Sequence, residues 1–287
     1  MTDLMNNIKS LREMTGSGFL DCKKALEANN NDLNDSVDYL RKKGLAKANK
    51  KASREAKEGA VGIFSNNNLT TIVQINTETD FAAKNEVFLN FMELIGEYSL
   101  KIENSEISID NFNEMLFDGT SIKDHFKNII SKIGENIVLS NMIIIENLDL
   151  MISNYIHNAY RKNIGKIAVV LRSKVDKIDE DAKILGKNLC MHIAASKPLA
   201  MNIELLDKQL IKKEKEVQLE SIKSSGKPEN IVNKILDGKM KKFYSESTFF
   251  NQQYILDTEK SVENIISEYS KKNEFKIVGY DSIFIGA

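Results

Sequence analysis

The chain has 287 residues, with 40 basic and 41 acidic side chains and a formal net charge of −1. At about 100–200 residues per domain, this length predicts two or three domains. Apolar residues make up 42% of the chain and charged residues 28%, which is typical of a globular protein and excludes a low-complexity chain. The near-neutral charge argues against affinity for nucleic acid over the whole surface and leaves only a local basic patch open.

We expect neither a targeting signal nor a membrane segment. The start of the chain carries Asp3 early and lacks a continuous apolar stretch, unlike a secretory signal. The most apolar region, 137–152, is interrupted by polar residues such as Asn141 and is therefore not expected to span a membrane. Cys22 and Cys190 form no CxxC pair, which indicates a reducing, cytoplasmic setting.

The first fifty residues predict three short helices separated by breaks at 15–18 and 29–31. Asp32 can cap the third helix, and Gly44 is expected to stop or kink it. From Arg41 to Glu58, eight basic residues oppose only two acidic ones. We interpret this stretch as a solvated, partly helical connector. Because no aromatic residue interleaves its charges, a nucleic-acid patch is the less favoured alternative.

The middle of the chain mixes strand and helix patterns and predicts an α+β fold with mainly antiparallel sheets covered by helices. An Asn-rich turn joins the first two strands, and Asp80 is expected to cap the helix that follows them. The strands are predicted at 60–66, 69–76, 138–146, 151–160, 167–173 and 275–285, and the helices at 82–101, 121–134, 179–195 and 260–271.

Two long polar helices are predicted at 202–224 and 228–246, around a turn at 224–228. Each carries one narrow apolar stripe, which suits a two-helix antiparallel arm better than a core helix. The facing stripes are expected to be Leu206, Leu210 and Val217 on the first helix and Val232, Leu236 and Phe243 on the second.

The sequence carries no motif of a nucleotide loop, a metalloprotease or a nucleophile elbow. Cys190 and His192 are one residue apart on a predicted helix, so their side chains diverge, and a structural role outweighs a zinc site. We expect no catalytic residue, no metal and no cofactor. The chain is predicted to be a binding protein and not an enzyme.

The tract from Thr77 to Asn85 is the most informative one. A predicted strand ends there, polar residues follow, and Phe81 stands in the first turn of the next helix. The residues alone leave two alternatives open. Phe81 could pack on its own helix as a hydrophobic staple, or it could face solvent as an interface anchor.

Several ordered motifs resemble one known family. Residues 79–85, TDFAAKN, resemble the TDFVAKN motif of bacterial elongation factor Ts, and LREMTGSGFLDCKKAL at 11–26 resembles that family's LREMTGAGMMDCKKAL. Further similar segments are KIGENIVL at 132–139, YIHNA at 155–159, MHIAASKP at 191–198 and SGKPENIVNKILDGKMKKF at 225–243. The likeness extends from the first residues to about 280, where many relatives continue into a further helix that we expect to be absent here.

The resemblance implies a division into four regions. It predicts an N-terminal three-helix, UBA-like module with the basic linker at 1–54 and a first core subdomain at 55–150. It places a second core subdomain at 151–200 and 247–287, and a protruding helical coiled-coil arm at 201–246.

The resemblance also implies a role: exchange of guanine nucleotide on elongation factor Tu, in which the factor displaces elements around the magnesium and phosphate site. Thr79, Asp80, Phe81 and Ala82 are implied in magnesium displacement. The implied partner contacts are Arg12, Phe19, Leu20, Lys23, Asp80, Phe81, Ile133, Gly134, His157, Ile255 and Leu256. Without the resemblance, Phe19 and Leu20 would pass as residues of the helical core, and His157 as an ordinary loop histidine.

The expected partner is elongation factor Tu, both GDP-bound and nucleotide-free, without direct nucleic-acid or membrane binding. A dimer or a heterotetramer with the partner is left open. The alternatives are a nucleic-acid-associated protein that uses the 41–57 stretch and an assembly protein that oligomerises through the 202–246 arm.

Overall fold

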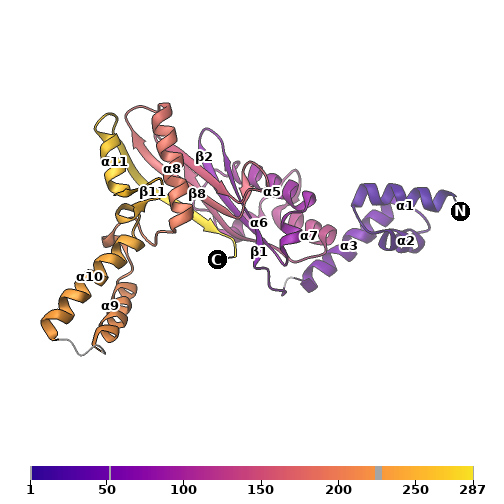
Figure 1. Cartoon of the computed structure of the whole chain (residues 1–287). Coiled ribbons are helices and arrows are strands. Elements are labelled where there is room, and N and C mark those ends of the chain that lie inside the picture. The colour runs from indigo at the N-terminus through magenta and orange to yellow at the C-terminus, as the bar shows by residue number, and fades with distance from the viewer. Residues whose placement is uncertain (1, 52, 224–227, 287) are drawn as a thin grey trace. The chain divides into compact units, whose positions relative to one another are not determined.

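The computed structural model of the protein describes residues 2–51, 53–223 and 228–286. Helices and antiparallel sheets alternate along the chain (Figure 1), which confirms the predicted α+β class. No helix in these described ranges is long and apolar enough to cross a bilayer. The chain divides into two compact units; the four-region division stays a prediction. The first unit contains Met1–Glu146, Ile156–Ala168 and Ile283–Ala287, and the second contains Asn147–Tyr155 and Val169–Ser282.

Three helices open the first unit, as predicted: α1 (Thr2–Thr15), α2 (Phe19–Ala28) and α3 (Leu33–Lys51). Asp32 caps α3, since its carboxylate accepts the backbone N–H of Asp35 at 2.8 Å. Small and aliphatic side chains from all three helices form one core. It consists of Ile8, Leu11, Cys22, Ala25, Leu26 and Leu40.

The expectation that Gly44 stops α3 is wrong. The helix continues through it to Lys51, well into the basic stretch. A Cβ atom at Gly44 would lie 2.4 Å from the hydroxyl oxygen of Ser131. The glycine therefore permits close packing of α3 against α7 (Ile122–Ile133).

A four-stranded antiparallel sheet forms the centre of the first unit, in the order β5-β2-β1-β7. The predicted hairpin is confirmed: its turn is closed by Asn66, whose side-chain oxygen accepts the N–H groups of Asn68 and Leu69 at 2.8 Å each. The strands are β1 (Glu58–Ser65), β2 (Leu69–Thr77), β5 (Ile137–Glu146) and β7 (Ile164–Gly165).

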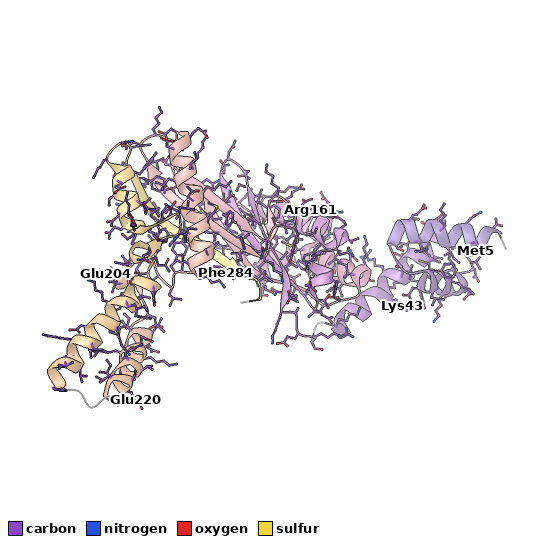
Figure 2. All side chains as sticks on the ribbon, in the orientation of Figure 1. Met5, Lys43, Arg161, Glu204, Glu220 and Phe284 are labelled. Atoms are coloured by element: carbon purple, nitrogen blue, oxygen red, sulfur yellow. The ribbon has the colours of Figure 1, made fainter. Side chains whose placement is uncertain are left out.

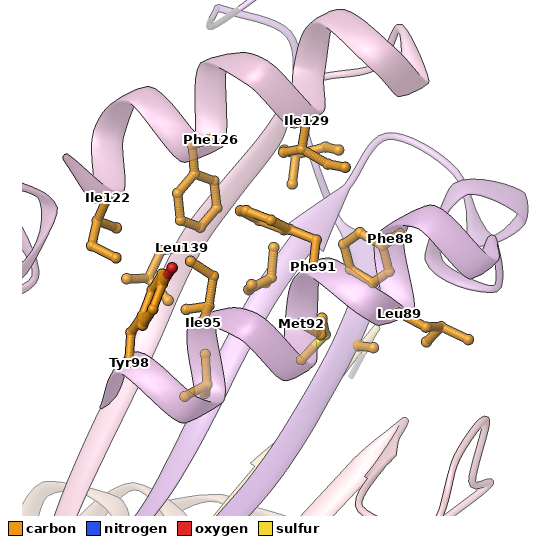
Figure 3. Packing of buried hydrophobic residues seen from close by; sticks show 14 of the residues in the cluster. Phe88, Leu89, Phe91, Met92, Ile95, Tyr98, Ile122, Phe126, Ile129 and Leu139 are labelled. Carbon is orange, nitrogen blue, oxygen red and sulfur yellow. The ribbon is translucent and has the colours of Figure 1, made fainter. Parts of the chain in front are cut away.

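Two amphipathic helices pack together over this sheet, α5 (Glu86–Ser99) and α7. Figure 3 shows Phe91 of α5 and Phe126 of α7 pointing toward one another; their rings meet edge to face with centroids 4.9 Å apart. Two features were not predicted from the sequence: the short α6 (Ile109–Glu114) and the hairpin of β3 (Leu116–Phe117) and β4 (Thr120–Ser121).

The single helix predicted at 82–101 is two helices, α4 (Asp80–Ala83) and α5. Thr79 caps α4 and Asn85 caps α5, with side-chain oxygens 3.2 Å and 2.8 Å from the N–H groups of Ala82 and Val87. The prediction that Asp80 is the cap is therefore wrong, because the threonine immediately before it takes that position.

Most of a three-stranded sheet belongs to the second unit, and the strand ends at 156–157, 167–168 and 283–284 belong to the first. Its order is β11-β8-β6, with β11 (Phe275–Phe284), β8 (Ile167–Val175) and β6 (Met151–His157). The strand predicted to run to Tyr160 ends at His157, since Asn158 has a left-handed backbone with φ 49°. The unit also contains α8 (Glu180–Ser196), α11 (Val262–Ser270) and the hairpin of β9 (Gln253–Tyr254) and β10 (Asp257–Ser261).

The two polar helices are α9 (Lys208–Lys223) and α10 (Glu229–Ser247), which pack on each other; Figure 2 labels Glu220 on α9. The helix predicted from 202 begins later, because Asn202 caps a separate short turn at Ile203–Leu205. The turn predicted at 224–228 lies outside the described residues except for its last one.

The apolar stripe predicted on the first of these helices is wrong. Val217 is 53% exposed, and Leu206 is buried but precedes α9. Ile211 and Leu219, with Ile222, take the inward positions, because they recur at helical spacing while Val217 falls on the opposite side. On α10 they pack with Val232, Leu236, Met240 and Phe243, so the stripe predicted for that helix is found.

A pair of glycine substitutions tests the packing at two helix positions, one on α5 against a buried ring and one on α10 facing open space. A Cβ atom at Gly96 of α5 would lie 2.3 Å from the buried ring of Phe64, whereas one at Gly238 of α10 meets nothing within 4 Å. We expect Gly96→Ala to lower the free energy of unfolding by about 1–3 kcal/mol. Gly238→Ala should raise it by about 0.5–1 kcal/mol, because alanine favours the helix. Urea unfolding followed by circular dichroism measures both; equal effects would contradict the packing.

Candidate functional site

The strongest candidate site is the corner between β2 and α4, defined here as Thr77–Lys84. Phe81 lies in its first helical turn with 82% of its surface exposed. The next two residues, Ala82 and Ala83, are buried and anchor the short helix to the body of the first unit. Of the two alternatives left open by the sequence, the structure shows the solvent-facing ring and excludes the staple.

Glu135 holds this corner in place. One oxygen of its carboxylate accepts the backbone N–H of Thr79 at 3.0 Å, and the other accepts the Thr79 hydroxyl at 2.7 Å. The same hydroxyl oxygen accepts the N–H of Ala82 as the helix cap. Since charge-assisted hydrogen bonds are the stronger kind, two of them on one residue fix the direction in which α4 leaves the sheet.

A second carboxylate completes the arrangement from the opposite segment. Glu78 accepts the backbone N–H of Asn136 at 2.6 Å, and Arg54 lies 3.4 Å from the same carboxylate. The buried side chain of Asn136 donates to the carbonyl of Arg54 at 2.6 Å. Glu78 thus binds the residue that follows Glu135, and Glu135 binds the residue that follows Glu78. These reciprocal bonds make the corner rigid.

Neither Glu78 nor Glu135 was predicted from the sequence as a site residue. A usable signal was present, because each glutamate directly adjoins a predicted contact segment: Glu135 follows Gly134, and Glu78 precedes Thr79. What the sequence could not supply was the pairing of two segments that are 56 residues apart.

Asp80 has an ionic role at the corner. Its carboxylate lies 2.7 Å from the ammonium group of Lys84, one helical turn away. The hydrogen bond from Lys84 lowers the pKa of Asp80, with a smaller contribution from the charge of Lys166. Lys166 in turn donates its backbone N–H to the carbonyl of His157 at 3.1 Å. The structure therefore brings the exposed His157, at the end of β6, into the same unit and near the same lysine.

Ile133 and Gly134 end α7 immediately before Glu135. Gly134 has a left-handed backbone with φ 89°, and its N–H donates to the carbonyl of Ile130 at 2.9 Å. Its own carbonyl accepts a hydrogen bond from the side chain of Lys51. These two predicted contact residues thus adjoin the corner through the Glu135 bonds.

The predicted N-terminal contacts cluster at the end of α1 and the start of α2. Leu20 is 69% exposed and Phe19 is 40% exposed. The core of the three-helix bundle uses other residues of α2, such as Cys22 and Leu26, so neither Phe19 nor Leu20 is a core residue. Arg12 is exposed, and Lys23 is half-buried, 3.7 Å from Glu27.

Ile255 and Leu256 belong to the second unit, where they form the turn between β9 and β10. Both side chains are exposed, Leu256 more than Ile255. The turn presents two adjacent apolar side chains to solvent.

The structural interpretation of Cys190 and His192 agrees with their surroundings. Both are buried, and both ring nitrogens of His192 are hydrogen-bonded to protein groups. Burial raises the pKa of the Cys190 thiol. Within the described ranges, no group of three or more His, Cys, Asp or Glu side chains is arranged to hold a metal ion.

The hydrogen bonds that hold Thr79 can be tested by removing its hydroxyl group. Thr79→Val loses both the cap of α4 and one bond to a carboxylate, and should lower the free energy of unfolding by about 2 kcal/mol. Ser108→Ala is the matched control, because Ser108 caps α6 with a single 3.2 Å bond; it should cost about 1 kcal/mol. Urea unfolding curves give both free energies. A smaller loss of unfolding free energy for Thr79→Val than for the control would contradict the stabilising role of these hydrogen bonds.

Comparisons with known proteins show which family the chain belongs to. The family model described as elongation factor TS matches residues 78–287, which include residues 78–84 of the corner and the Ile255–Leu256 turn. Similar proteins named elongation factor Ts come from Rhizobium meliloti, 36% identical over 94% of this chain and 88% of the relative, and from Sinorhizobium fredii, 37% identical over the same shares. The one from Brucella anthropi is 34% identical over 97% of this chain and 91% of the relative. The chain therefore belongs to the elongation factor Ts family of translation elongation factors.

Proposed function

We propose that this protein is a guanine-nucleotide exchange factor that binds elongation factor Tu in its GDP-bound and nucleotide-free states and promotes GDP release in the cytoplasm. The observation that carries the proposal is the exposed ring of Phe81 on a corner fixed by two carboxylates. The family membership supports the same role. In this role the chain makes and breaks no covalent bond, so it is not an enzyme.

Phe81 acts as a wedge. An exposed aromatic ring that becomes buried in a partner contributes about 2–3 kcal/mol. Because each 1.4 kcal/mol is a factor of ten, one ring can change nucleotide affinity by about 30- to 150-fold if it enters only the nucleotide-free form. Linkage makes the effect reciprocal: the factor weakens GDP binding by the ratio by which GDP weakens binding of the factor.

The rest of the corner supports the wedge. Thr79 and Ala82 hold the turn that carries the ring, and Asp80 places a negative charge beside it. We assign these residues, with Phe81, to displacement of the partner's magnesium ion. A carboxylate near a magnesium and phosphate site competes electrostatically with the phosphates for the cation.

The remaining contacts bind the partner and do not displace its magnesium ion. We assign Ile133, Gly134 and His157 to the neighbourhood of the wedge. Ile255 and Leu256 contact a second domain of the partner. The exposed Phe19 and Leu20 of the N-terminal module, which we propose is UBA-like, dock on the nucleotide domain together with Arg12 and Lys23. We further propose that α9 and α10 form a protruding coiled-coil arm, through which a dimer or a heterotetramer could assemble.

The experiment that tests this function is release of a fluorescent GDP analogue from elongation factor Tu. In a stopped-flow instrument, addition of this protein with an excess of unlabelled GDP should accelerate the loss of fluorescence in proportion to its concentration. A release rate equal to the spontaneous one would overturn the proposal.

Phe81→Ala separates the effect of the ring on GDP release from binding of the partner. The variant should fold and bind elongation factor Tu, but its acceleration of GDP release should fall by about 10- to 100-fold, because the buried ring is lost. Leu116→Ala is a matched control, since Leu116 is also strongly exposed in the first unit but belongs to the β3–β4 hairpin. Wild-type release by Phe81→Ala, or an equal loss in Leu116→Ala, would contradict the wedge.

A further inference from the structure

His192 lies under the turn that carries Ile255 and Leu256. The imidazole belongs to α8 and is fully buried. Its Nδ1 accepts the backbone N–H of Ile255 at 3.3 Å, and its Nε2 lies 2.9 Å from the side-chain oxygen of Gln252. One histidine therefore ties the turn of the β9–β10 hairpin to the residue just before β9.

The hydrogen bonds around Gln252 fix where the ring carries its proton. The amide nitrogen of Gln252 donates to the carbonyls of Ser196 and Glu246, at 3.2 Å and 2.8 Å. Since carbonyl oxygens only accept, the amide nitrogen must face them and the amide oxygen must face His192. The hydrogen then belongs on Nε2, which leaves the lone pair of Nδ1 free to accept from Ile255.

The surroundings keep this ring neutral. Burial lowers the pKa of His192, against a smaller opposing effect of the Gln252 bond. The rings packed around it are those of Phe249 and Tyr254, with centroids 5.8 Å and 5.9 Å away, and burial raises the pKa of Tyr254 so that its hydroxyl stays protonated. A second proton on the ring would face the N–H of Ile255 and break that bond.

The turn needs such an anchor, because its own pairing is irregular. Tyr254 pairs with Asp257 across a two-residue turn, and the register then shifts before Ser261. In a tight turn of this kind, the N–H of the first central residue, here Ile255, has no partner within the turn. His192 accepts it, and so orients the peptide from which two exposed apolar side chains project.

We propose that His192 is a positioning residue whose Nε2-protonated ring holds the Ile255–Leu256 turn in the conformation that binds a partner. The use made of the turn rests on the proposed function. The proton position and the anchoring of the turn do not, and they can be measured on the protein alone.

Two variants each remove one of the two hydrogen bonds of the His192 ring. In His192→Asn the side-chain oxygen can occupy the place of Nδ1 and accept from Ile255, while the bond to Gln252 is lost. In His192→Gln the amide group reaches the place of Nε2, while the bond to Ile255 is lost. Each variant loses one hydrogen bond, so the pair is matched in that respect.

Nuclear magnetic resonance reads the proton position directly. The chain has three histidines, and ¹⁵N-labelled imidazoles at pH 7 should show His192 with a protonated Nε2 and an unprotonated Nδ1. A protonated Nδ1, in either the neutral or the charged ring, would overturn the proposal. The backbone amide signal of Ile255 should move in His192→Gln and stay near its wild-type position in His192→Asn; an unmoved signal in His192→Gln would also overturn it.

Calorimetric binding to elongation factor Tu tests the consequence. Loss of one hydrogen bond that orders the turn should weaken binding about three- to tenfold in His192→Gln, with a smaller change in His192→Asn. Equal weakening in both variants would overturn the positioning role. Ile255→Ala with Leu256→Ala serves as the reference: wild-type binding by that double variant would remove the partner contact from the proposed function, whereas the imidazole and amide signals would still decide the role of His192.

Discussion

The bond between the carboxylate of Glu135 and Thr79 is the constraint on which the candidate site depends. A solvent-exposed aromatic ring on a mobile loop would lose much of its binding energy to ordering. Here the ring stands on a four-residue helix whose first residue follows a doubly held threonine, and whose last two residues are buried. The ordering cost is met in folding, and under the proposed function the energy of inserting the ring is then available to act on the partner.

The same principle recurs in the second unit with different chemistry. There the exposed residues are Ile255 and Leu256, and the group beneath them is a buried histidine and not a carboxylate. In both places, a polar side chain binds the backbone of the exposed segment and leaves its apolar side chains free. The molecule thus offers rigid apolar anchors on prepared backbones, which is the character of interface hot spots.

Much of this fold could be predicted from the sequence, because its signals are local. Apolar spacing located the helices of the first fifty residues, and the Asn-rich turn located the β1–β2 hairpin. The errors occurred where two local rules competed. Thr79 preceded Asp80 as a cap, and Gly44 served close packing where a helix end was expected. The α9 stripe was misplaced because one charged face and several aliphatic residues allow more than one helical phase.

The candidate site was harder to predict than the fold. Composition and spacing left Phe81 undecided between a packed and an exposed position, and only the ordered motifs suggested a partner for it. The contacts of the supporting groups were missed, since Glu135 and His192 bind residues 56 and 63 positions away. Pairing over such separations is a property of the tertiary structure, and no local pattern encodes it.

Under the proposed function, the ring at position 81 becomes buried when the partner releases its nucleotide. The chain contains no tryptophan, so Phe81→Trp labelled with 5-fluorotryptophan provides a single ¹⁹F signal at that position. In complex with nucleotide-free elongation factor Tu, this signal should shift and lose its sensitivity to a soluble paramagnetic relaxation agent, and added GDP should reverse both changes. A signal that stays solvent-accessible in a complex that exchanges nucleotide at the normal rate would contradict insertion of the ring.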